Sequence, residues 1–270
     1  MNNNDTIIKF VIDGYENFKK TDILHDGRKF VLKNKTDNFI SLPPKGFQYH
    51  RWAQSLKSSQ AFAYNVFSGV KNVKIQFEFP LEVFDRDAQI DVMLQDLNSK
   101  NIKLYEVKAF EICNLGRNKI KFKDKYFDLT KYKRDDIAKK FIDFLSSVIN
   151  HFENKKIYGG GVKQLCSHLL GILNIMDEPE YLNKKFLLYS FCFDYTISDT
   201  FEKHIKNYQD VLFDFKQLVD EFLRSIKVEE RIEYCGFLSA KDFLTKNQEL
   251  LGKENYDYVM KRYFFKNIEQ

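Results

Sequence analysis

The sequence contains few of the residues that build disulfide scaffolds, zinc sites or membrane spans. Its 270 residues include four cysteines and five histidines. The cysteines form no CxxC pair and the histidines show no metal-ligand spacing, so we expect buried thiols in a reducing compartment and no zinc site. No apolar run approaches the roughly 18 residues that a membrane span needs, and the first residues lack a charged-then-apolar signal sequence. These absences predict a cytoplasmic protein without a membrane partner.

Length and charge are consistent with one substantial domain and an anionic partner. The formal net charge is +5, which favours anions only mildly. A chain of this length suits one domain with a small appendage. The PPKG sequence at residues 43–46 interrupts the chain, and two short β-rich runs precede it, at residues 6–11 and 29–33. We therefore expect residues 1–48 to form a β-rich appendage and residues 49–270 to form the main domain.

The most informative stretch is residues 88–112, which reads as two strands folded back on each other. β-Rich, alternating sequence lies on both sides of a turn signal, Asn-Ser-Lys-Asn, at residues 98–101. If the hairpin closes on the two central residues of this signal, Asp91 lies opposite Lys108. The pattern predicts a hairpin that carries charged side chains at positions where core residues would be expected.

Two carboxylates and a lysine should converge on one face of this hairpin. Glu106 and Lys108 share a face because side chains alternate with period two, and the pairing adds Asp91 to it. Two like charges on a half-buried strand are costly unless a cation compensates them, and Mg²⁺ prefers such hard oxygen ligands. The alternative is an ordinary ion pair between Asp91 and Lys108 beside a solvated Glu106.

The same residues resemble a known signature. Asp91, followed across the hairpin by Glu106, Val107 and Lys108, resembles the D…(D/E)XK motif of the PD-(D/E)XK nuclease superfamily, the fold of many restriction endonucleases. The upstream run SSQAFAYNVF at residues 58–67 resembles the opening helix of a restriction-endonuclease-like bacterial branch, in which an SSQA…N…F pattern precedes the nuclease sheet. Two positions depart from the family pattern: Ile90 replaces the proline of the motif name, and Gln60 stands where other branches often carry a glutamate.

The resemblance implies a fold and a set of roles. The fold would be α/β, with a restriction-endonuclease-like αβββαβ core and a mixed central sheet flanked by helices. Asp91, Glu106 and the Val107 carbonyl would hold Mg²⁺, with Mn²⁺ as a substitute. Lys108 would orient the attacking water or neutralise the transition state. Gln60 would lie beside the metal and orient water or a carboxylate, and the alternative for it is a core amide bonded to the backbone.

The implied function is a Mg-dependent DNA endonuclease of restriction or antiphage type. The resemblance leaves open a homodimer, a cognate methyltransferase and an activating partner. It also leaves open a repair, mobile-element or RNA-cleaving nuclease of the same fold. A third alternative is a nucleic-acid-binding module without catalysis, in which the patch of carboxylates and lysine is only structural.

A basic stripe follows the hairpin. Its members are Arg117, Lys119, Lys121, Lys123 and Lys125, which alternate with other residues. In a strand they would form a wholly basic face, and such stripes attract phosphate backbones through counterion release. The alternative is an edge strand that lysines protect from aggregation. The position directly after the candidate catalytic strand favours DNA contact.

Periodicity predicts the remaining elements. Helices are expected over residues 52–70, 134–152, 162–176 and 201–226, with further helices from Ser239 and Glu254, and strands over residues 73–79, 185–195 and 231–238. The long helix at residues 201–226 is expected to pack on its own sheet, with a dimer seam as the alternative. Among the acidic residues near the first strand, Glu78 is the first choice for an extra metal ligand. The alternative is that these acidic side chains are only solvated. Gln164 is a weaker candidate for assisting at the site.

Overall fold

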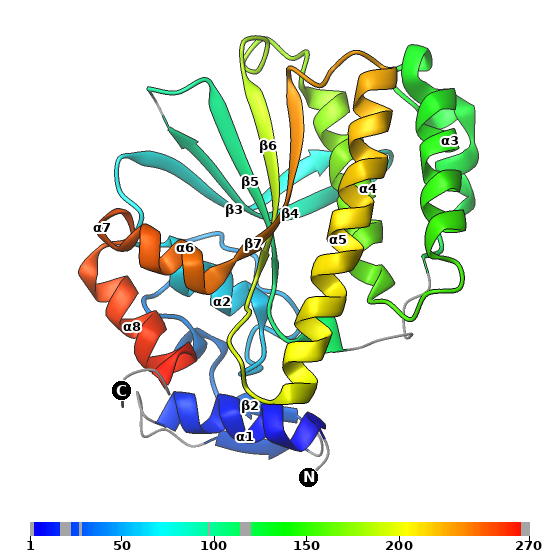
Figure 1. Ribbon diagram of the computed structural model, residues 1–270. Coiled ribbons are helices and arrows are strands. Elements are labelled where there is room, and N and C mark those ends of the chain that lie inside the picture. Colours follow the sequence, from blue (N-terminus) through cyan, green and yellow to red (C-terminus); the bar gives the residue numbers. More distant parts are fainter. Residues whose placement is uncertain (1–2, 17–22, 27–28, 97, 114–119, 266–270) are drawn as a thin grey trace.

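Alternating apolar residues build a five-stranded sheet at the centre of the protein (Figure 1). The structure is a computed structural model and describes residues 3–16, 23–26, 29–96, 98–113 and 120–265. The strands of the sheet, in spatial order, are β3 (Val73–Glu82), β4 (Asp87–Asp96), β5 (Asn101–Lys108), β6 (Lys185–Cys192) and β7 (Ile232–Ser239). A separate hairpin pairs β1 (Ile23–Asp26) with β2 (Lys29–Leu32).

The sheet is mixed. β3, β4 and β5 are antiparallel neighbours, whereas β5, β6 and β7 run parallel. The predicted α/β class is therefore confirmed, as is the chain order of one helix, three strands, helices and a further strand. The continuous apolar sequence of β6 is explained by its central place between two parallel neighbours.

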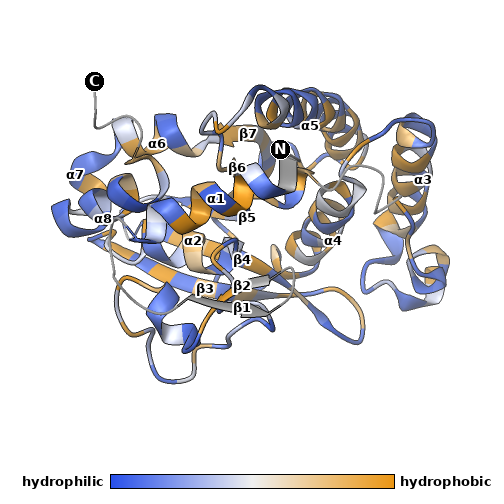
Figure 2. Cartoon of the chain, turned by 90° about the horizontal axis from the view of Figure 1, so that it is seen from below, coloured by the Kyte–Doolittle hydropathy of each residue, from blue (hydrophilic) through white to orange (hydrophobic). Residues whose placement is uncertain are grey.

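Helices cover both faces of the sheet (Figure 1). They are α1 (Asn3–Glu16), α2 (Ser59–Phe67), α3 (Asp135–Phe152), α4 (Gly159–Ile175), α5 (Asp199–Ser225), α6 (Ala240–Lys246), α7 (Gln248–Leu251) and α8 (Lys253–Tyr263), with 3₁₀ turns η1 (Lys35–Asn38), η2 (Glu111–Cys113), η3 (Asp124–Phe127) and η4 (Leu129–Lys131). α4 and α5 lie on one face, and α2 and α6 lie on the other. The amphipathic helices α3 and α5 carry hydrophobic and hydrophilic residues on different sides (Figure 2). The core therefore occupies two layers, one on each face.

The first β-rich run was predicted wrongly. Residues 6–11 lie within α1, and only the second run forms a strand, β2. Ile7, Phe10 and Val11 are spaced by three and one residues, which places them on one helix face, and all three are buried. The ring of Phe10 stacks on that of Phe265 with a centroid separation of 5.0 Å. α1 is helical because this apolar face packs against the end of the main core.

The helix predicted over residues 52–70 is shorter in the structure. α2 starts at Ser59 because the side chain of Ser58 caps it, accepting a hydrogen bond from the backbone N–H of Ala61 at 3.2 Å. The residues before the cap form turns. All of α2 after its first residue is buried, so the SSQA sequence combines a cap with a helix that belongs to the core.

The long helix α5 packs on its own sheet and on α3, as predicted. The Phe215 ring lies 5.4 Å from that of Tyr234 on β7, and the Phe222 ring stacks on Phe144 of α3 at 4.7 Å. α4 begins three residues before its predicted start and includes the glycine run. A Cβ at Gly161 would lie 2.2 Å from the hydroxyl oxygen of Tyr208 on α5, so only glycine permits this close approach of the two helices.

Buried polar residues join the N-terminal segment to α2 and α8. Asn65 on α2 accepts a hydrogen bond from the backbone N–H of Ile40 at 2.7 Å and donates to the carbonyl of Asn38 at 3.0 Å. Arg262 on α8 donates to the same carbonyl at 2.7 Å and also bonds the Asn38 side chain. Arg262 is only 3 % exposed. Residues 35–41 are therefore held to the main domain by specific hydrogen bonds.

Replacing Arg262 with methionine is expected to lower the free energy of unfolding by about 3 kcal/mol, since hydrogen bonds to a buried charge are lost and their acceptors stay unpaired. Urea unfolding followed by circular dichroism measures the change. The neighbouring exposed residue supplies a matched control, because Lys261→Met removes an equal charge from the surface of the same helix. Equal stability of the two variants would show that the Arg262 hydrogen bonds contribute little.

No helix in the described parts of the chain combines the length and the apolar character that a bilayer span requires. All four cysteines lie within these parts as free thiols. Cys166 and Cys192 are buried, as predicted, whereas Cys113 and Cys235 are only half-buried.

Candidate active site

The register of the β4–β5 hairpin differs by two residues from the predicted one. Val92 lies opposite Tyr105, so Asp91 does not lie opposite Lys108. The cause is the turn: the side chain of Asp96 accepts a hydrogen bond from the backbone N–H two residues further on, at 2.8 Å. This local bond starts the turn earlier than the Asn-Ser-Lys-Asn signal indicated.

A shift of two residues leaves every side chain on its predicted face. Asp91, Glu106 and Lys108 therefore still share one face of the sheet. All three are buried, with exposed fractions of 8 %, 2 % and 4 %. Ionisable groups are rarely buried to this extent without partners, and each of them has one.

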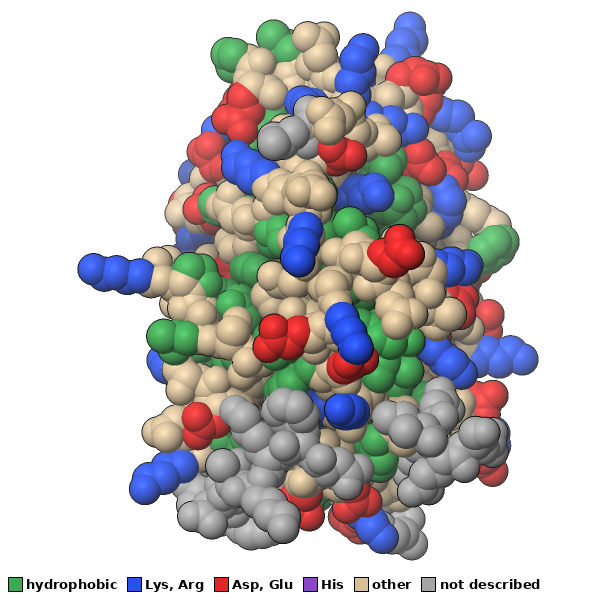
Figure 3. Space-filling view, turned by 90° about the vertical axis from the view of Figure 1, so that its left-hand side faces the viewer, with side chains coloured by type: hydrophobic (Ala, Val, Ile, Leu, Met, Phe, Trp, Pro, Cys, Tyr) green, Lys and Arg blue, Asp and Glu red, His purple; other side chains and the backbone are tan. Residues whose placement is uncertain are grey.

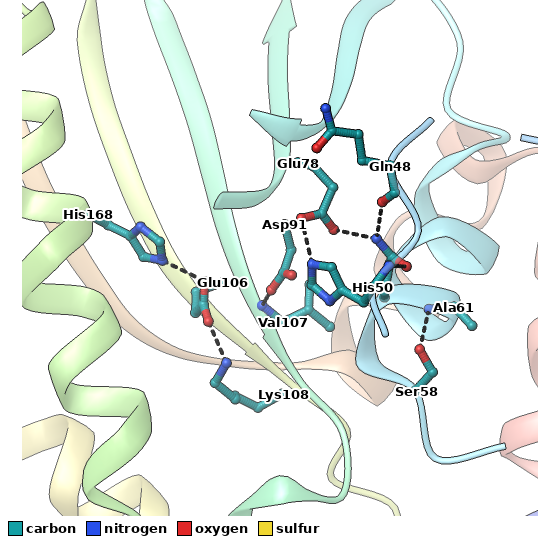
Figure 4. Close-up of polar contacts among 11 residues, drawn as sticks. Gln48, His50, Ser58, Ala61, Glu78, Asp91, Glu106, Val107, Lys108 and His168 are labelled. Atoms are coloured by element: carbon teal, nitrogen blue, oxygen red, sulfur yellow. Dashed lines mark hydrogen bonds and ion pairs between the residues drawn. The ribbon is translucent and has the colours of Figure 1, made fainter. Parts of the chain in front are cut away.

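Asp91 lies where β4 and β5 separate. Regular pairing ends at Val92, and beyond it the Asp91 carboxylate accepts a hydrogen bond from the Val107 backbone N–H at 2.6 Å (Figure 4). The carbonyl of Lys108 accepts a hydrogen bond at 2.8 Å from Phe193, just after β6. Successive carbonyls of a strand point to opposite edges, so the Val107 carbonyl points towards β4 and Asp91. A carboxylate and a backbone carbonyl thus face the same gap.

Glu106 is held between two side-chain partners, Lys108 and His168. One of its oxygens bonds the Lys108 ammonium, and the other lies 2.7 Å from Nε2 of His168 on α4 (Figure 4). Burial alone would raise the pKa of Glu106, but Lys108 and His168 outweigh it and lower the pKa to about 2. Burial likewise acts to lower the pKa of Lys108, yet Glu106 and Asp91 raise it above its ordinary value. Glu106 and Lys108 are therefore both charged at neutral pH.

Asp91 has the opposite electrostatic setting. Burial and the charge of Glu106 raise its pKa well above the usual range. A cation bound beside Asp91 would favour its ionised form.

The oxygen donors at this point fit Mg²⁺. In the described residues, only one oxygen of Asp91 accepts a hydrogen bond, and the Val107 carbonyl faces the same gap. Each Glu106 oxygen has a second lone pair beyond the one its partner uses. Groups of three or more metal-binding acid, histidine or cysteine side chains do not occur in the parts described. Two carboxylates and one carbonyl match the way in which Mg²⁺ is usually held, with waters completing the shell.

Gln60 lies inward on α2, as its position on the apolar helix face predicted, with 2 % of its surface exposed. Its side chain donates to the Gln48 carbonyl and to Glu78, and it accepts from the backbone N–H of His50, each at 2.9 Å. Gln60 therefore bonds both backbone and a carboxylate. The carboxylate that it touches is Glu78, not Asp91.

Glu78 has a strained backbone at the edge of the site. It lies at the position directly opposite Asp91, but β3 and β4 skip this pair, and the φ angle of Glu78 is +52°. A regular strand would point two like charges at each other. The left-handed conformation costs about 1–2 kcal/mol and turns the Glu78 carboxylate towards Gln60 and towards His50, at 2.9 Å. The hydrogen bond to Glu78 raises the pKa of His50.

Sequence reasoning missed two histidines at this site, His168 and His50. Gln164, the candidate predicted on this helix, is exposed and lies one helical turn before His168. The one available signal was a polar residue in the apolar run LCSHLLGIL of α4. His50 precedes α2 in an irregular segment, where periodicity gives no signal.

The predicted basic strand is not formed in the described part. Arg117 and Lys119 lie outside the described residues. Lys121 and Lys123 lie in an irregular segment that leads into η3, and Lys125 lies within η3. Phe122 and Tyr126 are buried four residues apart, which is the spacing of a helical turn. Lys125 pairs with Asp85. These lysines do not present a single basic face.

The arrangement combines an ionised Glu106–Lys108 pair with a carboxylate, Asp91, that a cation would keep charged. It can hold a divalent cation and place an ammonium group beside it. Comparison of the chain with protein-family models, curated proteins and solved structures found no match.

Proposed function

We propose that this chain is a metal-dependent nuclease of the PD-(D/E)XK type that hydrolyses phosphodiester bonds in DNA. One observation carries the proposal: the Asp91 and Glu106 carboxylates and the Lys108 ammonium are buried on one face, where two adjacent strands separate. The order of helix, three strands, helices and strand around them is also that expected for a restriction-endonuclease-like core.

Asp91, Glu106 and the Val107 carbonyl would hold the cation. When bound, Mg²⁺ supplies Lewis-acid polarisation of a phosphoryl oxygen and a lowered pKa for its water. The Lys108 ammonium stabilises negative charge that grows on the phosphoryl group, and it needs no reorganisation because Glu106 already fixes it. His168 orients the Glu106 carboxylate from the other side. Gln60 holds Glu78 away from Asp91 and so limits the negative charge at the site.

The proposal predicts Mg²⁺-dependent cleavage of DNA. Purified protein incubated with unmethylated plasmid and phage DNA should cleave both with Mg²⁺ and neither with EDTA. Discrete bands would indicate recognition of a sequence, and a smear would indicate nonspecific cleavage. A parallel RNA substrate tests the alternative substrate class. Absence of metal-dependent cleavage of either nucleic acid would contradict the proposed function.

A further inference from the structure

A pocket of about 550 Å³ opens between β4, η3 and α4. Ligand sites commonly have volumes of about 300–1,000 Å³, so this pocket could admit one small organic group with its charged substituent. It is formed by residues that no step of the proposed mechanism uses, with the exception of His168 at its inner end.

The pocket connects with the candidate active site. Asp87, Gln89 and Asp91 follow one another at intervals of two along β4, so their side chains share one face of the strand. The first two line the pocket, and the third is the candidate metal ligand. His168 also lines the pocket and lies 2.7 Å from Glu106. A group bound here would therefore lie beside the bond that the nuclease cleaves.

The pocket wall is basic. Arg86, Lys123 and Lys163 line it and form no ion pair with any residue that the structure describes. Lys125 also lines it but pairs with Asp85. Asp87 is the one carboxylate in the described lining. Three cations around one cavity repel each other, and an anionic ligand would relieve this repulsion.

Basic residues do not gather in this way among the described residues of the face shown in Figure 3. On the face shown in Figure 3, Lys and Arg side chains alternate with Asp and Glu side chains over the described surface. That face has no continuous basic band among its described residues. The pocket is thus a more specific candidate for phosphate contact than this surface.

Neutral groups in the wall suit a nucleobase. The exposed amides of Gln89 and Gln164 supply both donors and acceptors, which can bond the edge of a base. The rings of Tyr126 and Tyr158 also line the pocket, and aromatic side chains commonly contact unstacked bases. His168 Nδ1 is buried and has no hydrogen-bond partner among the described residues. Cations, amides and tyrosines together match the parts of one nucleotide.

We propose that this pocket binds one unstacked nucleotide of the substrate strand, next to the cleaved bond. Lys163 and Lys123 bind its phosphate, and the amides of Gln89 and Gln164 bind its base. A base must leave its stack to enter a pocket of this kind, so the preferred substrate has an unpaired nucleotide at the cleavage position. The inference rests on the proposed nuclease function for its substrate, but binding to the pocket can be measured without cleavage.

The test uses one DNA sequence in three forms: a paired duplex, the same duplex with a three-nucleotide bubble, and a single strand. Wild-type protein should cleave the bubble and the single strand with a kcat/KM at least about 10-fold above that of the paired duplex. Lys163→Glu should weaken binding of the single strand about 10-fold or more, measured by fluorescence anisotropy in EDTA. Lys139→Glu is the matched control, because Lys139 is exposed on α3 and does not line the pocket.

The outcomes separate the two proposals. Loss of single-strand binding in Lys163→Glu but not in Lys139→Glu would support nucleotide binding in the pocket. This holds even if none of the three DNA forms is cleaved, because absence of cleavage would contradict only the nuclease function. Equal cleavage of the three DNA forms, with equal single-strand binding by both variants, would overturn the proposal that the pocket binds an unstacked nucleotide. Binding of free dAMP that requires Lys163, combined with unchanged oligonucleotide binding in Lys163→Glu, would also overturn it and indicate a free nucleotide as ligand.

Discussion

Replacement of Lys108 by methionine is expected to slow DNA cleavage by about 10²–10³-fold while the chain still folds and binds DNA. The Lys108 ammonium is buried on the same face as Asp91 and Glu106, where a phosphoryl group would gain negative charge. Methionine keeps the apolar part of the side chain and removes only the charge. Single-turnover cleavage of plasmid DNA measures the loss, and DNA binding is measured separately in EDTA.

The control for this variant is Lys103→Met. Lys103 lies on the same strand but is exposed, so its loss should leave cleavage unchanged. Because Lys108→Met leaves Glu106 with one fewer partner, circular dichroism and thermal unfolding of the variant check that any loss of activity is not a loss of folding. Cleavage at the wild-type rate by a folded Lys108→Met protein would exclude Lys108 from the reaction.

Asp91→Asn is expected to abolish the response to Mg²⁺. In wild-type protein, bound metal should raise the thermal midpoint of unfolding, because a ligand that binds only the folded state stabilises it. Asparagine keeps the shape of the side chain but loses the charge that draws the cation. Without metal, the variant should be at least as stable as wild type, since it removes a buried carboxyl group whose pKa is raised first by burial and then by the charge of Glu106.

The measurements are thermal unfolding with and without Mg²⁺, together with single-turnover cleavage, which should fall by about 10²–10³-fold. Asp143→Asn serves as the control, because Asp143 is exposed on α3 and far along the chain from the site. A Mg²⁺-dependent rise in the midpoint that persists in Asp91→Asn would mean that a different acid holds the metal.

The faces of the hairpin could be predicted because they depend only on the alternation of side chains. The register could not, since it depends on the hydrogen bond that Asp96 makes in the turn. An error of two residues changed which residue lies opposite Asp91 but kept Asp91 beside Glu106 and Lys108. An alternating sequence pattern thus predicts which side chains share a face of the sheet more securely than it predicts which residues of two strands lie opposite each other.

Residues that come together only in the tertiary structure could not be predicted. His168 reaches Glu106 from a helix 62 positions along the chain, and His50 reaches Glu78 across 28. Neither spacing carries a local signal. α1 was predicted as a strand for a related reason, because six apolar-rich residues fit either period until the packing of Phe10 is known.

The left-handed backbone of Glu78 also affects how this protein meets its neighbours. β3 is one of the two outer strands of the sheet, and a regular strand of ten residues there would offer a row of unpaired backbone groups to a second chain. Glu78 interrupts that row, and Pro80 contributes no N–H to it. The left-handed conformation of Glu78 turns its own carboxylate away from Asp91. The same conformation makes the outer edge of β3 a poor template for intermolecular β-pairing.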